Sequence, residues 1–368
     1  MYVEKDGVTV LNQKCIRNGK IDFALSRLSD VEKKVAIDKF LIAGDILINS
    51  TGVGTAGRVG FFEGGKETTI DSHVTVVRVD INKAAPKFIF YNLLGMESEI
   101  ETFAEGTTGQ TELSRDRVRE IAIPLPPLPE QRAIAAVLSS LDDKIDLLHR
   151  QNKTLEGMAK TVYAYFFIDN RKVSWKECPL SELANHQKIS IHPNKNPASL
   201  FYHYSIPAFD EAHMPIPELG TLIQSNKYAV TKNTILFSKL NPHKDKRVWL
   251  ISSSIDANSV CSTEFQVMNP KADKYLFFLY GFISHPGNYN EIAAGVGGTS
   301  GSHQRIDPDV IFTFKCFLPD DTTVTEYNET VGLIFTKIHH NRQSIQTLVK
   351  QRDSLLPKLM SGEVRVHL

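Results

Sequence analysis

The chain contains one unit twice, and this repetition constrains its fold more than any other feature. Lys87–Tyr91 resembles Lys274–Phe278, and Gly106–Gly109 resembles Gly298–Gly301, each pair at a spacing of about 190 residues. Each copy passes from a β-rich region through an apolar stretch and a polar loop to a predicted strand and a long helix. A duplicated chain of this kind favours two related units and suits a ligand that offers two sites at a fixed separation.

Composition bounds the class of protein. A chain of 368 residues favours two or more domains, each with its own core. Lys plus Arg and Asp plus Glu both number 42, which counts mildly against nucleic-acid binding, although Lys239–Arg247 is locally basic. The four cysteines have no CxxC spacing, so neither a zinc site nor a disulfide framework is indicated. No signal segment or membrane-length apolar run is found, which predicts a cytoplasmic protein without a membrane partner.

The first β-rich region covers residues 1–128. His73–Val79 is dense in β-branched residues and predicts a strand, and Gly44–Asn49 predicts a turn that leads into a buried strand. Pro86–Leu94 predicts a short helix, and Ile121–Ile123 predicts a strand that the following prolines end. The second β-rich region, residues 171–324, repeats this pattern.

Each β-rich region precedes a long predicted helix, at residues 129–170 and 325–361. Apolar residues recur at spacings of three and four, which is the narrow seam of a coiled coil rather than an ordinary helix face. We expect the two helices to pair antiparallel; the alternative is that each packs only on its own domain. Asn152 and Asn341 interrupt the seam, where a polar residue fixes register at a cost in stability. The predicted seam residues are Leu141, Ile145, Leu148, Asn152, Leu155, Ile338, Asn341, Ile345 and Leu348.

Several of these segments resemble the specificity subunits of type I restriction–modification systems. Ile123–Ala135 resembles the central conserved region of that family, and Leu355–Glu363 resembles its C-terminal conserved end. Gly44–Leu47 and Thr107–Gln110 fit its target-recognition domains. The resemblance covers nearly the whole chain, and the segments are specific only when taken together.

The resemblance implies a DNA reader that is not an enzyme by itself. Its fold class would be α/β, of the α+β type, with two tandem target-recognition domains, each followed by a long helix, and the helices forming an antiparallel coiled coil. Double-stranded DNA, two adenine methyltransferase subunits and a restriction (motor-nuclease) subunit would be its partners. S-adenosylmethionine, ATP and Mg would belong to those partners, and no cofactor or metal is expected in this chain.

The first copy departs from the family pattern where it begins. Trp175–Leu183 is a typical opening for these domains, and its counterpart would fall before Met1. The domain at residues 1–128 is therefore expected to be N-terminally incomplete.

Two kinds of loop are candidates for DNA contact. The glycine loop, Gly52–Gly60, lacks the GK[ST] ending of a phosphate loop, so a nucleotide site is not indicated. It is either a simple turn or a hairpin whose amides and Arg58 approach DNA phosphates. The second copy has the basic segment Pro242–Arg247 instead, which predicts two different half-sites.

The polar loops, residues 106–111 and 298–305, recur in both copies. Gln110 or Gln304 could pair with adenine and Arg305 with guanine in the major groove, whereas the alternative for any one residue is a solvated connection. The residues expected to face DNA are Arg58, Thr107, Thr108, Gln110, Arg115, Lys239, Lys244, Lys246, Arg247, Ser302, His303, Gln304 and Arg305.

Other function classes remain as alternatives. A coiled-coil scaffold whose β-rich domains bind protein or glycan would show no salt-dependent affinity for duplex DNA. A nuclease or methyltransferase in its own right would need a metal or cofactor motif, and the sequence offers neither.

Overall fold

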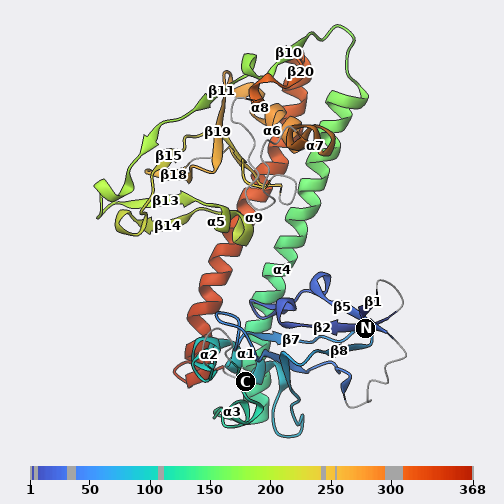
Figure 1. The fold of residues 1–368 in the computed structure, drawn as a ribbon, viewed down its shortest axis with the longest axis vertical. Helices are drawn as coiled ribbons and strands as arrows, with labels where there is room; N and C mark the ends of the chain where they lie inside the picture. The colour runs from blue at the N-terminus through green and yellow to red at the C-terminus, as the bar shows by residue number, and fades with distance from the viewer. Residues whose placement is uncertain are drawn as a thin grey trace. The chain divides into compact units, whose positions relative to one another are not determined.

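The computed structural model describes residues 2–3, 7–30, 39–106, 112–241, 246–252, 255–294 and 310–366. Its internal contacts divide the chain into two compact units. Unit 1 holds residues 1–145 and 347–368, and unit 2 holds residues 146–346. Each unit thus combines one β-rich region with a segment of each long helix (Figure 1). In the described part of the chain, no helix is both long and apolar enough to cross a membrane.

Unit 1 contains small sheets and short helices. Its strands are β1 (Tyr2–Val3), β2 (Gly7–Leu11), β3 (Ile16–Arg17), β4 (Lys20–Ile21), β5 (Arg27–Asp30), β6 (Ile46–Asn49), β7 (Val59–Phe61), β8 (Thr68–Ile70) and β9 (Val74–Val77). They pair in the orders β1-β5-β2-β8, β3-β4 and β7-β6-β9. The short helices are α1 (Pro86–Gly95), α2 (Glu97–Thr102) and α3 (Arg115–Arg119).

Unit 2 is larger. Its strands are β10 (Glu177–Pro179), β11 (Ala184–Gln187), β12 (Ser190–Ile191), β13 (Leu200–Tyr204), β14 (Ile216–Leu219), β15 (Lys227–Ala229), β16 (Thr234–Ser238), β17 (Val248–Ile251), β18 (Ser259–Ser262), β19 (Phe265–Pro270) and β20 (Lys315–Phe317). They pair in the orders β11-β19-β16-β17, β12-β15-β18-β13-β14 and β10-β20. The short helices are α5 (Ile206–Ala212), α6 (Leu276–Ser284), α7 (Pro286–Ala294) and α8 (Val310–Thr313).

The internal repeat is visible in the hydrogen-bonded register of the strands. β6 lies between β7 and β9, as β16 lies between β17 and β19, and all four pairings are antiparallel. Ile46 faces Val77 in unit 1, and Ile235 faces Met268 in unit 2. In the same way β2 pairs antiparallel with β5 and parallel with β8, as β13 does with β14 and β18. The repeat predicted from the sequence is therefore a repeat of topology.

The two units differ at the outer edge of this sheet. In unit 2, β11 pairs with β19, and β10 pairs with β20. Neither place is taken by a strand in the described part of unit 1. Val76 and Val77 of β9 are accordingly half-buried, whereas Val267 and Met268 of β19 are fully buried. The predicted strand at Ile121–Ile123 is wrong for the same reason, because this segment precedes its helix as β20 does but has no partner strand.

Two long helices follow the β-rich regions. α4 spans Leu128–Ala164 and continues as one π-helical turn at Tyr165–Asp169, and α9 spans Asp321–Ser361. Pro129 occupies the first turn of α4, where its missing N–H costs nothing. Gly362 has a φ of 76° and ends α9.

The helices pair with each other in antiparallel fashion. In unit 2, Asn152 contacts Asn341, and Phe166 of the π-helical turn contacts Tyr327. Later residues of α4 therefore meet earlier residues of α9, so the two helices run in opposite directions. In unit 1, Arg352 of α9 donates to Asp142 of α4 at 2.9 Å. The predicted fold class is confirmed, and the alternative in which each helix packs only on its own domain is excluded.

None of the predicted seam residues is exposed. Leu141, Leu155 and Leu348 are half-buried. The remaining six are buried: Ile145, Leu148, Asn152, Ile338, Asn341 and Ile345.

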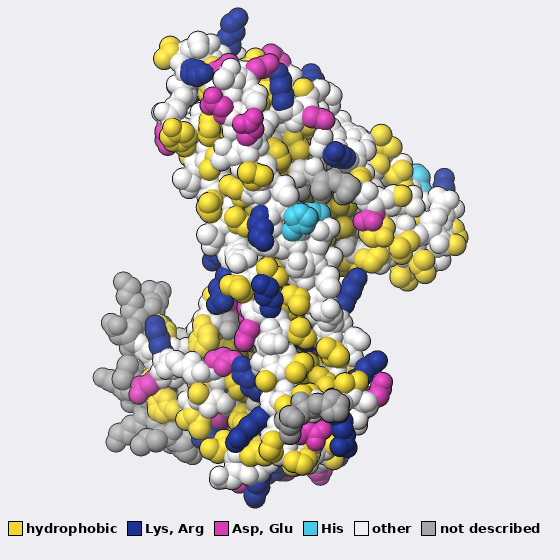
Figure 2. Space-filling model, turned by 180° about the vertical axis from the view of Figure 1, so that it is seen from behind, with side chains coloured by type: hydrophobic (Ala, Val, Ile, Leu, Met, Phe, Trp, Pro, Cys, Tyr) yellow, Lys and Arg dark blue, Asp and Glu magenta, His cyan; other side chains and the backbone are white. Residues whose placement is uncertain are grey.

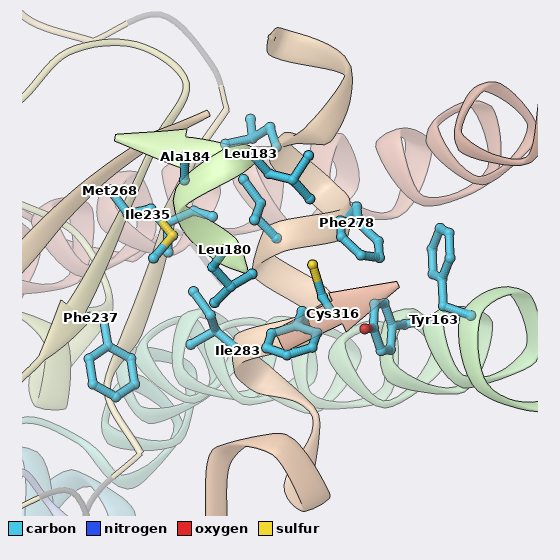
Figure 3. Close-up of a cluster of buried hydrophobic side chains, with 14 of the residues drawn as sticks. Tyr163, Leu180, Leu183, Ala184, Ile235, Phe237, Met268, Phe278, Ile283 and Cys316 are labelled. Atoms are coloured by element: carbon cyan, nitrogen blue, oxygen red, sulfur yellow. The ribbon is translucent and has the colours of Figure 1, made fainter. Parts of the chain in front are cut away.

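The core of unit 2 joins its sheet to both helices through α6. Figure 3 shows Leu180, Leu183 and Ala184, from the segment around β10 and β11, gathered with Ile235 and Met268 of the sheet. Phe278 of α6 and Tyr163 of α4 belong to the same cluster. In unit 1 the equivalent core combines α1 with α4 and with Leu356 and Leu359 of α9.

Candidate nucleic-acid interface

The glycine loop of unit 1 is a hairpin between β6 and β7. The Gly57 N–H donates to Asn49 O at 2.8 Å, and the Asn49 N–H donates to Arg58 O at 2.9 Å. The chain returns directly to strand β7 and not to a helix. A nucleotide-binding phosphate loop is therefore ruled out at this position.

Part of this loop is already engaged by α2. The Gly54 N–H donates to Glu101 Oε1 at 3.0 Å, and the Val59 N–H donates to Glu97 Oε1 at 2.6 Å. A Cβ atom on Gly57 would lie 2.9 Å from the backbone N of Glu101, so only glycine permits this approach. Burial raises the pKa of Glu97. These two amides hold the loop on α2, which favours the interpretation of a packed turn for this side of the loop.

Arg58 is positioned by the loop itself. Its Nη2 donates to Gly54 O at 2.8 Å, and its side chain is half-buried. The guanidinium therefore stays beside the tip of the glycine loop, where Val53 and Gly54 are exposed.

The base of the first polar loop lies beside the glycine loop. The Glu105 N–H donates to Glu112 O at 3.0 Å and the Glu112 N–H donates to Glu105 O at 2.9 Å, closing residues 106–111 at their stem. The Leu113 N–H then donates to Ser50 O at 2.7 Å. Two loops far apart in the sequence thus emerge from one place in unit 1.

Helix α3, which follows the polar loop closely in the sequence, carries three arginines: Arg115, Arg117 and Arg119. Arg117 pairs with Glu105 at 2.7 Å, and Arg119 pairs with Asp116 at 2.7 Å. Arg115 is exposed and has no acidic partner among the described residues. It is therefore the arginine of α3 that a phosphate can reach without breaking an ion pair.

The basic segment of unit 2 is more constrained than its sequence indicates. Arg247 donates from Nε and Nη2 to the two carboxylate oxygens of Asp210, both at 2.7 Å, and its side chain is 11% exposed. Lys246 Nζ lies 4.6 Å from the centroid of the Tyr289 ring. Lys239 follows β16, and its N–H donates to Glu264 O at 2.9 Å. Arg247 therefore ties the basic segment to α5 through its ion pair with Asp210.

The remaining predicted contacts are outside the described residues. These are Thr107, Thr108, Gln110, Lys244, Ser302, His303, Gln304 and Arg305.

Three polar residues of unit 1 join this surface without any signal in the sequence. Thr51 Oγ1 donates to Gln13 Oε1 at 2.8 Å and lies 3.1 Å from His73 Nδ1. They come from three separate segments, and no local motif connects them. Only the pairing of Thr51 with Glu112 places them next to the polar loop.

Charge is distributed rather than concentrated. On the face shown in Figure 2, basic and acidic side chains are interspersed in each unit, in keeping with the equal totals of 42. On that face the described residues form no large basic field, so any attraction for a polyanion there comes from local groups.

Comparison with known proteins finds a matching domain and several similar proteins. Residues 7–157 match the family model described as the type I restriction modification DNA specificity domain. The type I restriction enzyme MjaIX specificity subunit of Methanocaldococcus jannaschii is 26% identical over 312 residues, which cover 75% of this chain and 69% of that protein. The HindI specificity subunit of Haemophilus influenzae is 28% identical over 182 residues, which cover 48% of this chain and 39% of that protein.

The fold is likewise similar to a solved structure. The type I restriction-modification system S subunit from M. genitalium superposes with a TM-score of 0.57 at 16% identity, over 97% of this chain and 90% of that one. The repeated topology, the antiparallel helix pair and these relatives agree with the resemblance seen in the sequence. Residues 7–157 thus match the type I DNA specificity domain, and the chain as a whole is similar to specificity subunits of type I restriction–modification systems.

Proposed function

We propose that this chain reads an asymmetric, bipartite DNA target and docks two methyltransferase subunits on its helix pair. The observation that carries the proposal is the matched register of β6–β9 and β16–β19, since two domains with one topology are suited to the same task. Residues 1–128 and 171–324 are the proposed target-recognition domains, and residues 129–170 and 325–361 are the proposed spacers.

The two halves of the target should differ. Unit 1 has a glycine loop between its paired strands, whereas unit 2 has a basic segment with Arg247 tied to Asp210 at the corresponding place. Different side chains read different base edges, so an identical half-site on both sides would be unexpected. Two readers on one spacer favour half-sites about one helical turn apart, roughly 10 bp between centres.

The docking proposal rests on the helices. Leu147 and Met158 of α4 and Leu333 of α9 are exposed although they are apolar. Apolar side chains on a helix that already has its partner are suited to a further protein surface. Two helices of opposite direction present two related faces, one for each methyltransferase. A motor-nuclease subunit would join the same complex, and the setting would be the cytoplasm.

Methylome sequencing tests the whole proposal. Cells that carry this chain with its methyltransferase should show one asymmetric motif with a non-specific gap and one methylated adenine in each half. Gln110→Ala should relax preference in one half and Gln304→Ala in the other, at about 1–3 kcal/mol per lost base contact. A continuous or palindromic motif would contradict two different readers, and methylation confined to one half would contradict two docked subunits.

Arg115 offers a separate test of the interface in unit 1. Arg115→Ala should weaken binding to target and unrelated duplexes alike and reduce the slope of log affinity against log salt by about 1, because a phosphate contact carries no sequence information. Arg119→Ala is the matched control, since it removes an equal charge that Asp116 already neutralises on the same helix. Fluorescence anisotropy over a salt series measures both. If Arg115→Ala and the parent chain have equal slopes of log affinity against log salt, α3 does not contact the DNA.

A chain that binds no duplex DNA at low salt would instead be the coiled-coil scaffold whose β-rich domains bind protein or glycan.

A further inference from the structure

Unit 2 contains a cavity of about 150 Å³ where its sheet meets the helices. α4, α6 and α9 form its walls together with β17 and the loop that follows α5. All the residues that line it belong to unit 2. Of the residues that line it, only Lys246 is also among the predicted DNA contacts.

The lining of the cavity carries an excess of positive charge. Lys160 of α4 and Lys246 line it, and neither has a carboxylate partner among the described residues. Arg342 is paired with Glu156 at 3.0 Å, and Glu156 is the lining carboxylate. Burial and the nearby charge of Lys160 lower the pKa of Lys246. Two like charges that face one cavity are stabilised by an anion between them.

The histidines of the cavity add hydrogen-bonding groups rather than charge at neutral pH. Burial is the main cause that lowers the pKa of His285 and His339, and it lowers the pKa of His213 to about 4. A neutral imidazole offers one donor and one acceptor.

Three buried polar atoms of the lining residues lack hydrogen-bond partners among the described residues: Trp249 Nε1, Ser284 Oγ and His285 Nδ1. Trp249 is 2% exposed, and its Nε1 has no hydrogen-bond acceptor among the described residues. The buried Nδ1 of His285 is likewise unpartnered there. Buried polar groups normally have a partner, so each of these indicates a missing ligand or water.

Aromatic rings supply the apolar walls. The Tyr163 ring packs directly on α6 at Gly281, where an added Cβ atom would lie 2.2 Å from the ring. Tyr280 meets Phe335 edge-on at 5.2 Å, and Lys246 lies over the ring of Tyr289. A cavity of this volume holds about one benzene ring.

We propose that this cavity binds a small aromatic carboxylate. The ring lies between the aromatic walls, and the carboxylate accepts hydrogen bonds from Lys160, Lys246 and the unpartnered donors. Such a ligand contacts both the sheet and the helices, so its binding stabilises their junction in unit 2.

The probe is benzoate, compared with two molecules that each lack one of its features. Benzamide keeps the ring without the charge, and acetate keeps the charge without the ring. Calorimetry or ligand-detected NMR on the full chain should show benzoate bound at least about tenfold more tightly than either, because each omission removes one of the two matched interactions.

Variants assign the effect to the cavity. Lys160→Met and Lys246→Met should each weaken benzoate binding at least about fivefold and leave benzamide binding unchanged. Lys232→Met, an exposed lysine of unit 2 outside the cavity, should change neither. Unaltered circular dichroism shows that the variants fold. The proposal is overturned if acetate or benzamide equals benzoate, if benzoate does not bind, or if both cavity variants bind it as the parent does.

Discussion

Phe278→Ala will lower the free energy of unfolding of unit 2 by about 3–5 kcal/mol, the range for removing a fully buried phenyl ring. Phe278 is 2% exposed. Its ring centroid lies 4.9 Å from that of Phe167 and 6.2 Å from that of Tyr163. These neighbours belong to α4 and its π-helical turn, so truncation leaves a void where α6 joins the sheet to the helix.

Tryptophan fluorescence in a urea titration measures this effect selectively. Both tryptophans of the chain, Trp175 and Trp249, lie in unit 2, so their emission reports the unfolding of that unit. Tyr165→Ala is the control, because this aromatic side chain follows α4 directly but is 59% exposed, and it should cost less than about 1 kcal/mol. Equal midpoints for Phe278→Ala and Tyr165→Ala would show that α6 does not support the core.

Asn341→Leu will destabilise the helix pair by about 1–3 kcal/mol, the cost of a buried polar group without a partner. Asn341 Nδ2 donates to Asn152 Oδ1 at 2.9 Å, and both side chains are buried. The leucine leaves Asn152 with an unpaired amide inside the seam. The double variant Asn152→Leu/Asn341→Leu should recover most of the loss or exceed the parent, because two leucines pack without any polar desolvation.

A double-mutant cycle in urea separates these contributions. If the double variant is as unstable as the two single variants combined, the amides do not act as a pair. The stabilised double variant should nevertheless lose specificity of register, since a seam of leucines alone accepts shifted pairings.

The sequence was informative where a pattern repeats along the chain. Spacings of three and four residues located both helices, and the seam pair of Asn152 and Asn341 follows from that spacing. Strand β6 was predicted from the turn and apolar run at Gly44–Asn49, and the repeat about 190 residues later predicted a second β-rich region. Local periodicity and internal comparison sufficed for these elements.

Contacts between distant segments could not be predicted. The ion pair of Arg247 with Asp210 depends on the position of α5, and nothing near Arg247 in the sequence indicates it. Cys178 and Cys316 place their sulfur atoms 3.9 Å apart because β10 pairs with β20. The segment at Ile121–Ile123 has the composition of a strand, but strand formation needs a neighbouring strand that composition does not reveal.

The sharing of α9 between the two units has a consequence for the order of folding during synthesis. The core of unit 1 includes Leu356 and Leu359, so residues 1–145 leave the ribosome long before their core can be completed. The roughly 200 residues of unit 2 take about 10–40 s to translate at typical rates. During that interval the first-made domain exposes apolar surface on α1 and α4, and chaperone binding should be directed to these helices. The domain that is synthesised first is the last to be finished.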